Sequence, residues 1–207
     1  MVGLVLSILA SPVSHSVALA GHTFGSGDCW RIGTPYTCRN NWAGPNTLLR
    51  LRLVDLLGDA TITAKAEIAR YNWSVASGPQ LFSWSASSGD SLVYLYRDYS
   101  VPLYNGLTAN YDQWGYVCGY NPCGIQFTDI KVHPSILSSP YRTAASLFAH
   151  EMGHSLGLSE HNEDAAAIMK QNYNSYEGPQ AIDRGPIPAC STSNNYLGVK
   201  CIYNYNY

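Results

Sequence analysis

Charge is scarce in this sequence. Only 13% of its 207 residues are charged, and 14 acidic residues against 12 basic ones leave a formal net charge of -2. This balance provides no strongly cationic surface, so we expect neither nucleic acid nor membrane as a partner. Internal repeats and long linkers are also missing, and no apolar run after residue 20 is long enough to span a bilayer. We expect one soluble, monomeric domain.

The first twenty residues contain no Lys or Arg, yet they are apolar and end in small residues. Ala18-Leu19-Ala20 fits the small-x-small rule for cleavage of a secretory signal. We therefore predict a signal peptide over residues 1–20 and an exported, extracellular domain over residues 21–207. A buried N-terminal helix is the alternative.

No CxxC spacing occurs, which disfavours a zinc site made of cysteines. The six cysteines instead form three close pairs, which in an exported chain predict local disulfides. Six cysteines allow fifteen pairings, so the connectivity is a hypothesis. The predicted pairs are Cys29 with Cys38, Cys118 with Cys123, and Cys190 with Cys201.

The first half of the chain alternates between strand and helix patterns. Thr47 to Asp55 has the period-two alternation of a half-buried strand. Residues 59–78 then change to a helical period, with Asp59 or Thr61 as the cap and Gly78 at the end. The predicted buried stripe of this helix is Ala60, Ala64, Ile68, Tyr71 and Val75.

Further strands are predicted before a second helix. Ser91 to Tyr99 is rich in strand formers, Gln113 to Cys118 is a candidate short strand, and Gly124 to His133 is a clearer one. The alternation of that last strand slips near Asp129, as it would at a bulge. This order of elements predicts an α+β layer, followed from Asn172 onward by a mostly irregular part.

The second helix carries two histidines in metal-ligand spacing. A helix ending at Gly157 places His150 and His154 at positions i and i+4, so both imidazoles project from one face. Glu151 lies beside the first of them, where a carboxylate can reach a metal-bound water without binding the metal. Such a string can arise by chance, but this helix is otherwise apolar, where uncompensated His and Glu would be costly to bury. The pattern favours a zinc site.

HEMGHSLGLSEH, from His150 to His161, followed by AIM ending at Met169, resembles the zinc-binding consensus and Met-turn of the metzincin metallopeptidases. Among them it is most similar to the matrixins. The resemblance implies a single metzincin-like catalytic domain with a twisted mixed sheet, a long helix and an active-site helix. It also implies a zinc endopeptidase that hydrolyses peptide bonds with a zinc-bound water.

By this resemblance, His150 and His154 would bind zinc, Glu151 would be the general base, Gly157 would turn the chain, and Met169 would form an apolar floor under the metal. Zinc is the implied cofactor, and structural calcium is a second candidate without a clear loop signature. The implied partner is a protein or peptide substrate.

The third zinc ligand departs from the family pattern. A histidine is expected three residues after Gly157, but Glu160 stands there and His161 follows it. Zinc accepts both imidazole and carboxylate, so both readings stay open. We prefer His161, because Met169 lies eight residues beyond it, as the family spacing implies.

Two other hypotheses remain. The chain could be a catalytically inactive metzincin-like protein, although retention of Glu151 argues against this. It could also be a disulfide-stapled extracellular binding protein, which only the composition supports. For an enzyme, the family implies a peptide lying along an edge strand, which Gln113 to Phe127 could supply.

Overall fold

The structure is a computed structural model that describes residues 29–30, 51–76, 82–85, 91–118, 124–158 and 168–169. Within these ranges, no helix combines the length and apolar character that crossing a bilayer requires. The predicted signal peptide, most of the cysteines and the part after Asn172 lie outside the described residues. The predictions made for them therefore stay predictions.

A five-stranded mixed sheet forms the frame, in the order β3-β2-β4-β7-β5. Four of its strands run parallel, and β5 pairs antiparallel with β7. The strands are β2 (Leu51–Leu56), β3 (Phe82–Ser83), β4 (Ser91–Arg97), β5 (Gly106–Tyr111) and β7 (Phe127–Val132). A separate parallel pair joins β1 (Cys29–Trp30) to β6 (Gly124–Ile125). The α+β class with a mixed sheet is confirmed.

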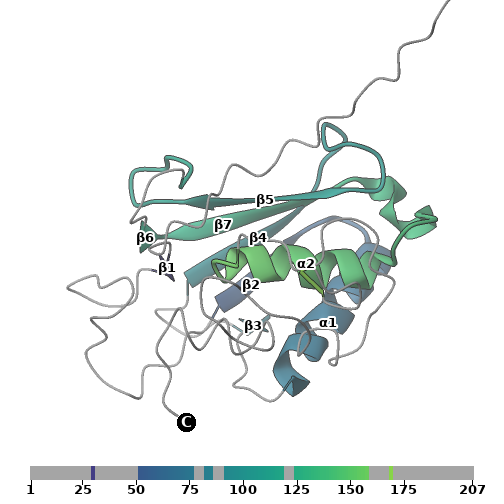
Figure 1. Ribbon diagram of the computed structural model, residues 1–207, viewed down its shortest axis with the longest axis horizontal. Helices are drawn as coiled ribbons and strands as arrows, with labels where there is room; N and C mark the ends of the chain where they lie inside the picture. Colours follow the sequence, from purple (N-terminus) through teal and green to yellow (C-terminus); the bar gives the residue numbers. More distant parts are fainter. Residues whose placement is uncertain are drawn as a thin grey trace, which may run out of the picture.

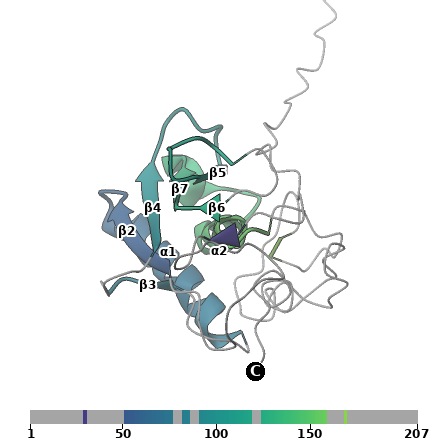
Figure 2. The same cartoon turned by 90° about the vertical axis from the view of Figure 1, so that its left-hand side faces the viewer.

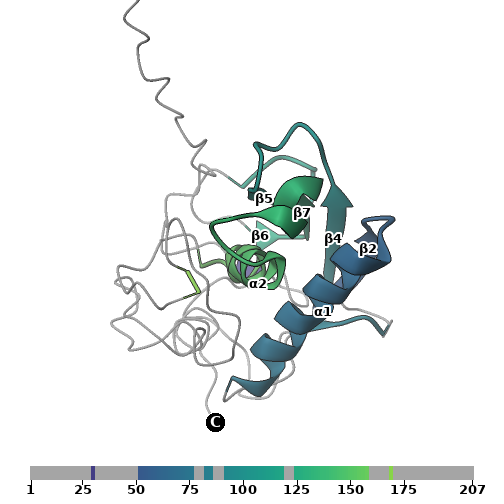
Figure 3. The same cartoon turned by 90° about the vertical axis from the view of Figure 1, so that its right-hand side faces the viewer.

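Two helices lie on the same face of the five-stranded sheet (Figures 1 and 2). They are α1 (Ala60–Val75) and α2 (Ala144–Ser155), and a 3₁₀ helix, η1 (Pro134–Ser138), precedes α2. Figure 3 looks almost along α2 and shows α1 passing beside it. The indole of Trp73 on α1 joins the two helices, because its Nε1 donates to the carbonyl of Ala149 at 3.0 Å.

The helix prediction for α1 is confirmed, but its predicted buried stripe is wrong. Asp59 caps the helix by accepting from the amides of Thr61 and Ile62. The buried face consists of Ile62, Ala66, Ala69, Asn72 and Trp73, whereas Ile68, Tyr71 and Val75 of the predicted stripe are exposed. Both of these faces of α1 carry apolar residues at helical spacing, so periodicity alone could not show which face is buried. The face with Ile62 and Trp73 packs into the core.

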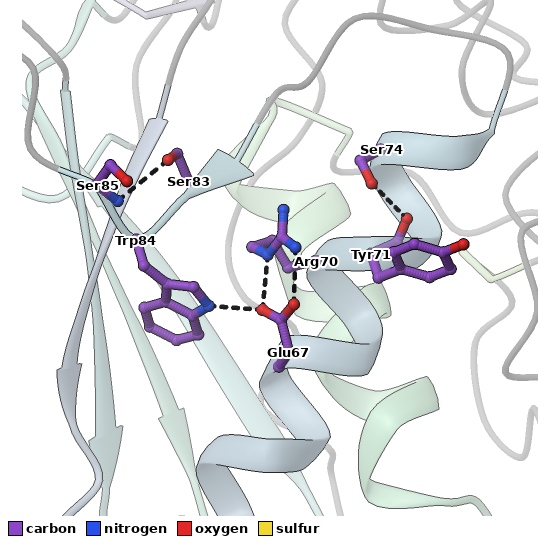
Figure 4. A network of polar contacts seen from close by, with 7 residues as sticks. All are labelled: Glu67, Arg70, Tyr71, Ser74, Ser83, Trp84 and Ser85. Atoms are coloured by element: carbon purple, nitrogen blue, oxygen red, sulfur yellow. Dashed lines mark hydrogen bonds and ion pairs between the residues drawn. The ribbon is translucent and has the colours of Figure 1, made fainter.

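A polar contact ties the outer side of α1 to the residue after β3 (Figure 4). Trp84 Nε1 donates to Glu67 Oε2 at 2.6 Å, and Arg70 pairs with the same carboxylate. The Arg70 guanidinium lowers the pKa of the Glu67 carboxyl below its ordinary value, against a smaller raising effect of burial. The end of the sheet and the middle of α1 are thereby held together.

Two strand predictions need correction. The segment Gln113–Cys118 contains only an isolated bridge between Tyr111 and Val117, and the strand in this region is β5, which the sequence analysis missed. The predicted bulge near Asp129 is also wrong, because β7 keeps regular register with β4 and β5 through that residue. The interruption of the predicted strand lies instead at Gln126, between β6 and β7.

The core fills the space between the sheet and the two helices. Alternate residues on the sheet point into it, while their neighbours are only partly buried. The inward set on the three central strands is Leu51, Leu53, Val93, Leu95, Thr128, Ile130 and Val132. Every residue of α2 is buried, so the helix that carries the motif is enclosed by the fold.

Candidate metal centre

The sequence predicted helix α2 and its end near Gly157, but it did not identify the residue that caps the start. Thr143 caps the start, since its hydroxyl oxygen accepts from the amide of Ser146 at 3.1 Å. Gly157 ends the helix with a φ of 85°, a left-handed conformation that glycine adopts at little cost. The amide of Leu158 donates to Gly153 and that of Gly157 to His154, which is the Schellman pattern of a helix end.

The helix end orients the second histidine. Because the chain reverses at Gly157, the carbonyl of Leu158 returns to the ring of His154 and accepts from Nδ1 at 2.6 Å. The ring of His150 is held likewise, with its Nδ1 2.7 Å from the carbonyl of Ile168. A carbonyl only accepts, so Nδ1 carries the proton in both rings. In the neutral imidazoles, both Nε2 atoms therefore keep their lone pairs.

The two Nε2 atoms face each other at a short distance. The Nε2 atoms of His150 and His154 lie 3.1 Å apart, and the rings are nearly perpendicular at 89°. Two nitrogens bound to one tetrahedral zinc would be about 3.3 Å apart, given Zn–N distances of about 2.0–2.1 Å. Ring nitrogens that donate to backbone carbonyls on their far side are also typical of zinc-binding histidines. The spacing and orientation of these two nitrogens therefore fit two ligands of one zinc ion.

The third donor is not placed. Both candidates, Glu160 and His161, lie outside the described residues. Within the described part of the chain, no group of three or more His, Cys, Asp or Glu side chains could hold a metal ion. The structure thus brings together two of the three predicted ligands.

Glu151 lies in the interface between α2 and β5. It is 5% exposed, and its Oε2 accepts a hydrogen bond from Thr108 Oγ1 at 2.6 Å. Burial raises the pKa of the Glu151 carboxyl to about 7, although the Thr108 hydroxyl and the positive charge of Arg142 both lower it.

Met169 packs against helix α2 beside Gly153. It is fully buried, and a methyl group added at Gly153 would collide with its Sδ atom. Glycine between the two histidines is thus required by close packing and not by backbone conformation. Its neighbour Ile168 supplies the carbonyl for His150, so this turn also supports one proposed ligand.

Three polar residues near the site were missed by the sequence analysis. Thr108 and Asn110 on β5 and Thr128 on β7 are buried, and two of them contact α2 directly. For Thr108 and Asn110 the signal in the sequence was the alternation of Gly106–Tyr111, which places the apolar residues on the opposite, half-buried face.

Of the cysteines, Cys118 is described with its side chain. It is fully buried and disulfide-bonded. The predicted partner Cys123 lies outside the described residues, so the pairing is still a prediction.

Comparison with known proteins gives one family. Residues 82–184 match the family model described as Matrixin, a span that contains β3 to α2 together with Met169. No curated protein matches the chain.

Proposed function

Residues 82–184 match the matrixin family of zinc-dependent metallopeptidases. From this match we propose that the chain is a secreted endopeptidase of that family. One observation carries the proposal: the Nε2 atoms of His150 and His154 converge, while each Nδ1 is held by a backbone carbonyl. Glu151 follows the first histidine directly and has its carboxyl group held by Thr108. Two ligands and a base are thus supported by separate contacts.

The proposed chemistry is hydrolysis of a peptide bond. Bound zinc supplies a Lewis acid that lowers the pKa of a water molecule and polarises a carbonyl group. Glu151 takes a proton from the attacking water on its carboxylate and later delivers it to the nitrogen of the leaving amine.

We propose His161 as the third zinc ligand, with Glu160 as the alternative. The proposal rests on zinc's acceptance of imidazole and on the spacing to Met169. The measurement is zinc affinity of the variants His161→Ala and Glu160→Ala, by competition with a chromophoric chelator. Release of zinc by the Glu160 change alone would assign the carboxylate and refute His161.

The substrate class follows from the family, which acts on proteins or peptides. We propose that an extended peptide lies along β5, the edge strand that packs on α2, and not along Gln113–Phe127 as first expected. Secretion rests on residues 1–20 and is proposed on that pattern alone.

The first experiment is cleavage of a denatured protein by the zinc-loaded chain and by its Glu151→Ala variant. We expect cleavage by the parent only, equal zinc content in both, and loss of activity when a chelator removes the metal. Equal cleavage by both proteins would reject Glu151 as the base. Zinc binding without cleavage in either protein would favour a non-catalytic, zinc-stabilised binding protein.

A further inference from the structure

The inner face of β5 differs from the inner faces of its neighbours in the sheet. At the positions where β2, β4 and β7 carry mainly aliphatic side chains, β5 carries Thr108 and Asn110, which are 1% and 2% exposed. Burying a polar side chain is costly unless its hydrogen-bonding groups find partners. Each of these two residues has a partner on α2, at the part of the helix that carries Glu151 and His154.

Thr108 contacts the proposed base at two atoms. Its hydroxyl oxygen is 2.6 Å from Glu151 Oε2 and 3.1 Å from the carbonyl oxygen of Glu151. The backbone of β5 closes the other side, since a methyl group added at Gly106 would lie 2.9 Å from Cγ and Oε1 of Glu151. The carboxylate is therefore held between a hydroxyl donor and a strand that leaves no room for a side chain.

Asn110 contacts the turn that carries the second histidine. Its Nδ2 donates to the carbonyl of His154 at 3.2 Å, the same carbonyl that accepts from the Gly157 amide. The amide of Asn110 is fixed in turn, because Thr128 Oγ1 donates to its Oδ1 at 2.6 Å. Because the carbonyl of His154 can only accept, the end of the Asn110 amide that faces it is the nitrogen, and the end that faces Thr128 is the oxygen.

We propose that Thr108 and Asn110 are positioning residues, Thr108 for the carboxylate of Glu151 and Asn110 for the helix end that carries His154. This inference rests on the proposed function. Its geometry follows from the periods of the two elements, because strand residues i and i+2 share a face, as do helix residues i and i+3. Catalytic groups act only within about 0.5 Å of their productive position, which makes such support effective.

The chain offers a matched control for Thr108. Thr63 on α1 also donates to a carboxylate and lies near a backbone carbonyl, with Asp55 Oδ2 at 2.7 Å and the carbonyl of Asp59 at 3.0 Å. It makes the same kind of contact between α1 and the end of β2, in a more exposed position than Thr108. Thr63→Val therefore measures the cost of losing such a hydroxyl without touching the site.

The first test uses zinc-free protein and needs no activity. Urea midpoints are measured for Thr108→Val, Glu151→Ala and the double variant. If the contact exists, the double variant loses less stability than the sum of the single variants, because both remove the same hydrogen bond. Thr63→Val combined with Glu151→Ala should be additive. Additivity of Thr108→Val with Glu151→Ala would overturn the contact.

The second test separates positioning from folding. Thr108→Val should lower kcat on the order of 10- to 100-fold with KM and zinc content unchanged, and Thr108→Ser should restore it. Thr63→Val should leave kcat unchanged. Failure of the serine to rescue, or an equal loss from Thr63→Val, would overturn the role of Thr108.

The third test addresses Asn110 through metal binding. Asn110→Leu, an apolar residue of similar size, should weaken zinc affinity on the order of 10- to 100-fold, whereas Thr108→Val should not. Unchanged zinc affinity in Asn110→Leu would overturn its role. If the parent itself cleaves no substrate, the proposed function fails and the catalytic role of Thr108 fails with it, while the zinc measurement still decides the role of Asn110.

Discussion

Adding one methyl group at Gly153 tests the packing beneath the proposed metal site. The new carbon would collide with Sδ of Met169 and lie 3.1 Å from its Cε and 3.4 Å from Cζ2 of Trp73. Both neighbours are fully buried, so neither side chain can move into solvent. Gly153→Ala is therefore a test of whether the Met169 turn lies against α2.

Two opposing effects determine how much Gly153→Ala changes the free energy of unfolding. Overpacking a buried site costs about 1–3 kcal/mol, while alanine is about 1 kcal/mol more favourable than glycine inside a helix. Because the collision involves a buried sulfur atom, we expect packing to win and the free energy of unfolding to fall by about 1–2 kcal/mol. For a chain of this length, Tm would then fall by roughly 2–8 °C.

Urea and thermal unfolding of the zinc-free protein provide the assay. The control is the same substitution in a Met169→Ala background, which by itself costs about 2–5 kcal/mol. In the Met169→Ala background the new methyl group has no sulfur atom beside it. Gly153→Ala should then be neutral or should stabilise the fold through helix propensity alone. A higher midpoint for Gly153→Ala in the parent background would refute the packing of Met169 on the helix.

Two further substitutions test how α1 is attached. Trp73→Phe removes the donor to the Ala149 carbonyl and should lower the free energy of unfolding by about 1–3 kcal/mol, measured by urea unfolding; an unchanged midpoint would contradict this contact. Arg70→Met should lower the urea midpoint at pH 7, because Arg70 depresses the pKa of Glu67 below 4.5. The stability from a depressed carboxyl pKa is complete above 4.5 and is lost as the pH falls through the lower folded pKa. The difference in urea midpoint between the parent and Arg70→Met should therefore shrink below pH 4.5. A difference that stays constant with pH would reject the ion pair as its cause.

The parts of the molecule that the sequence predicted well have local causes. The end of α2 follows from Gly157 as stop, and the spacing of His150 and His154 follows from the helical period. Such features depend on residues within one or two turns, which is the range that a sequence pattern reports. The α+β order of elements could be predicted for the same reason.

Tertiary packing decided what the sequence analysis missed. On α1 two apolar faces competed, and contact of Trp73 with Ala149 on α2 selects the buried one. On β5 the pattern was reversed: Leu107 and Tyr111 lie on the half-buried face, while polar Thr108 points into the interface with α2. Alternation assigns apolar residues to the inside, so a strand that turns polar residues inward is misread.

That reversal has a physical reason in the position of α2. On one side of the helix, Met169 fills the space that Gly153 leaves, and Trp73 holds the carbonyl of Ala149. On the other side, Thr108 and Asn110 contact the helix by hydrogen bonds, which fix direction as well as distance. Aliphatic residues on β5 would bury as much surface but would let the helix slide along its axis. The proposed site needs two ring nitrogens and a carboxylate in fixed positions, and directional contacts serve that need better than apolar area does. This accounts for the buried polar side chains of Thr108 and Asn110 on β5 and of Thr128 on β7.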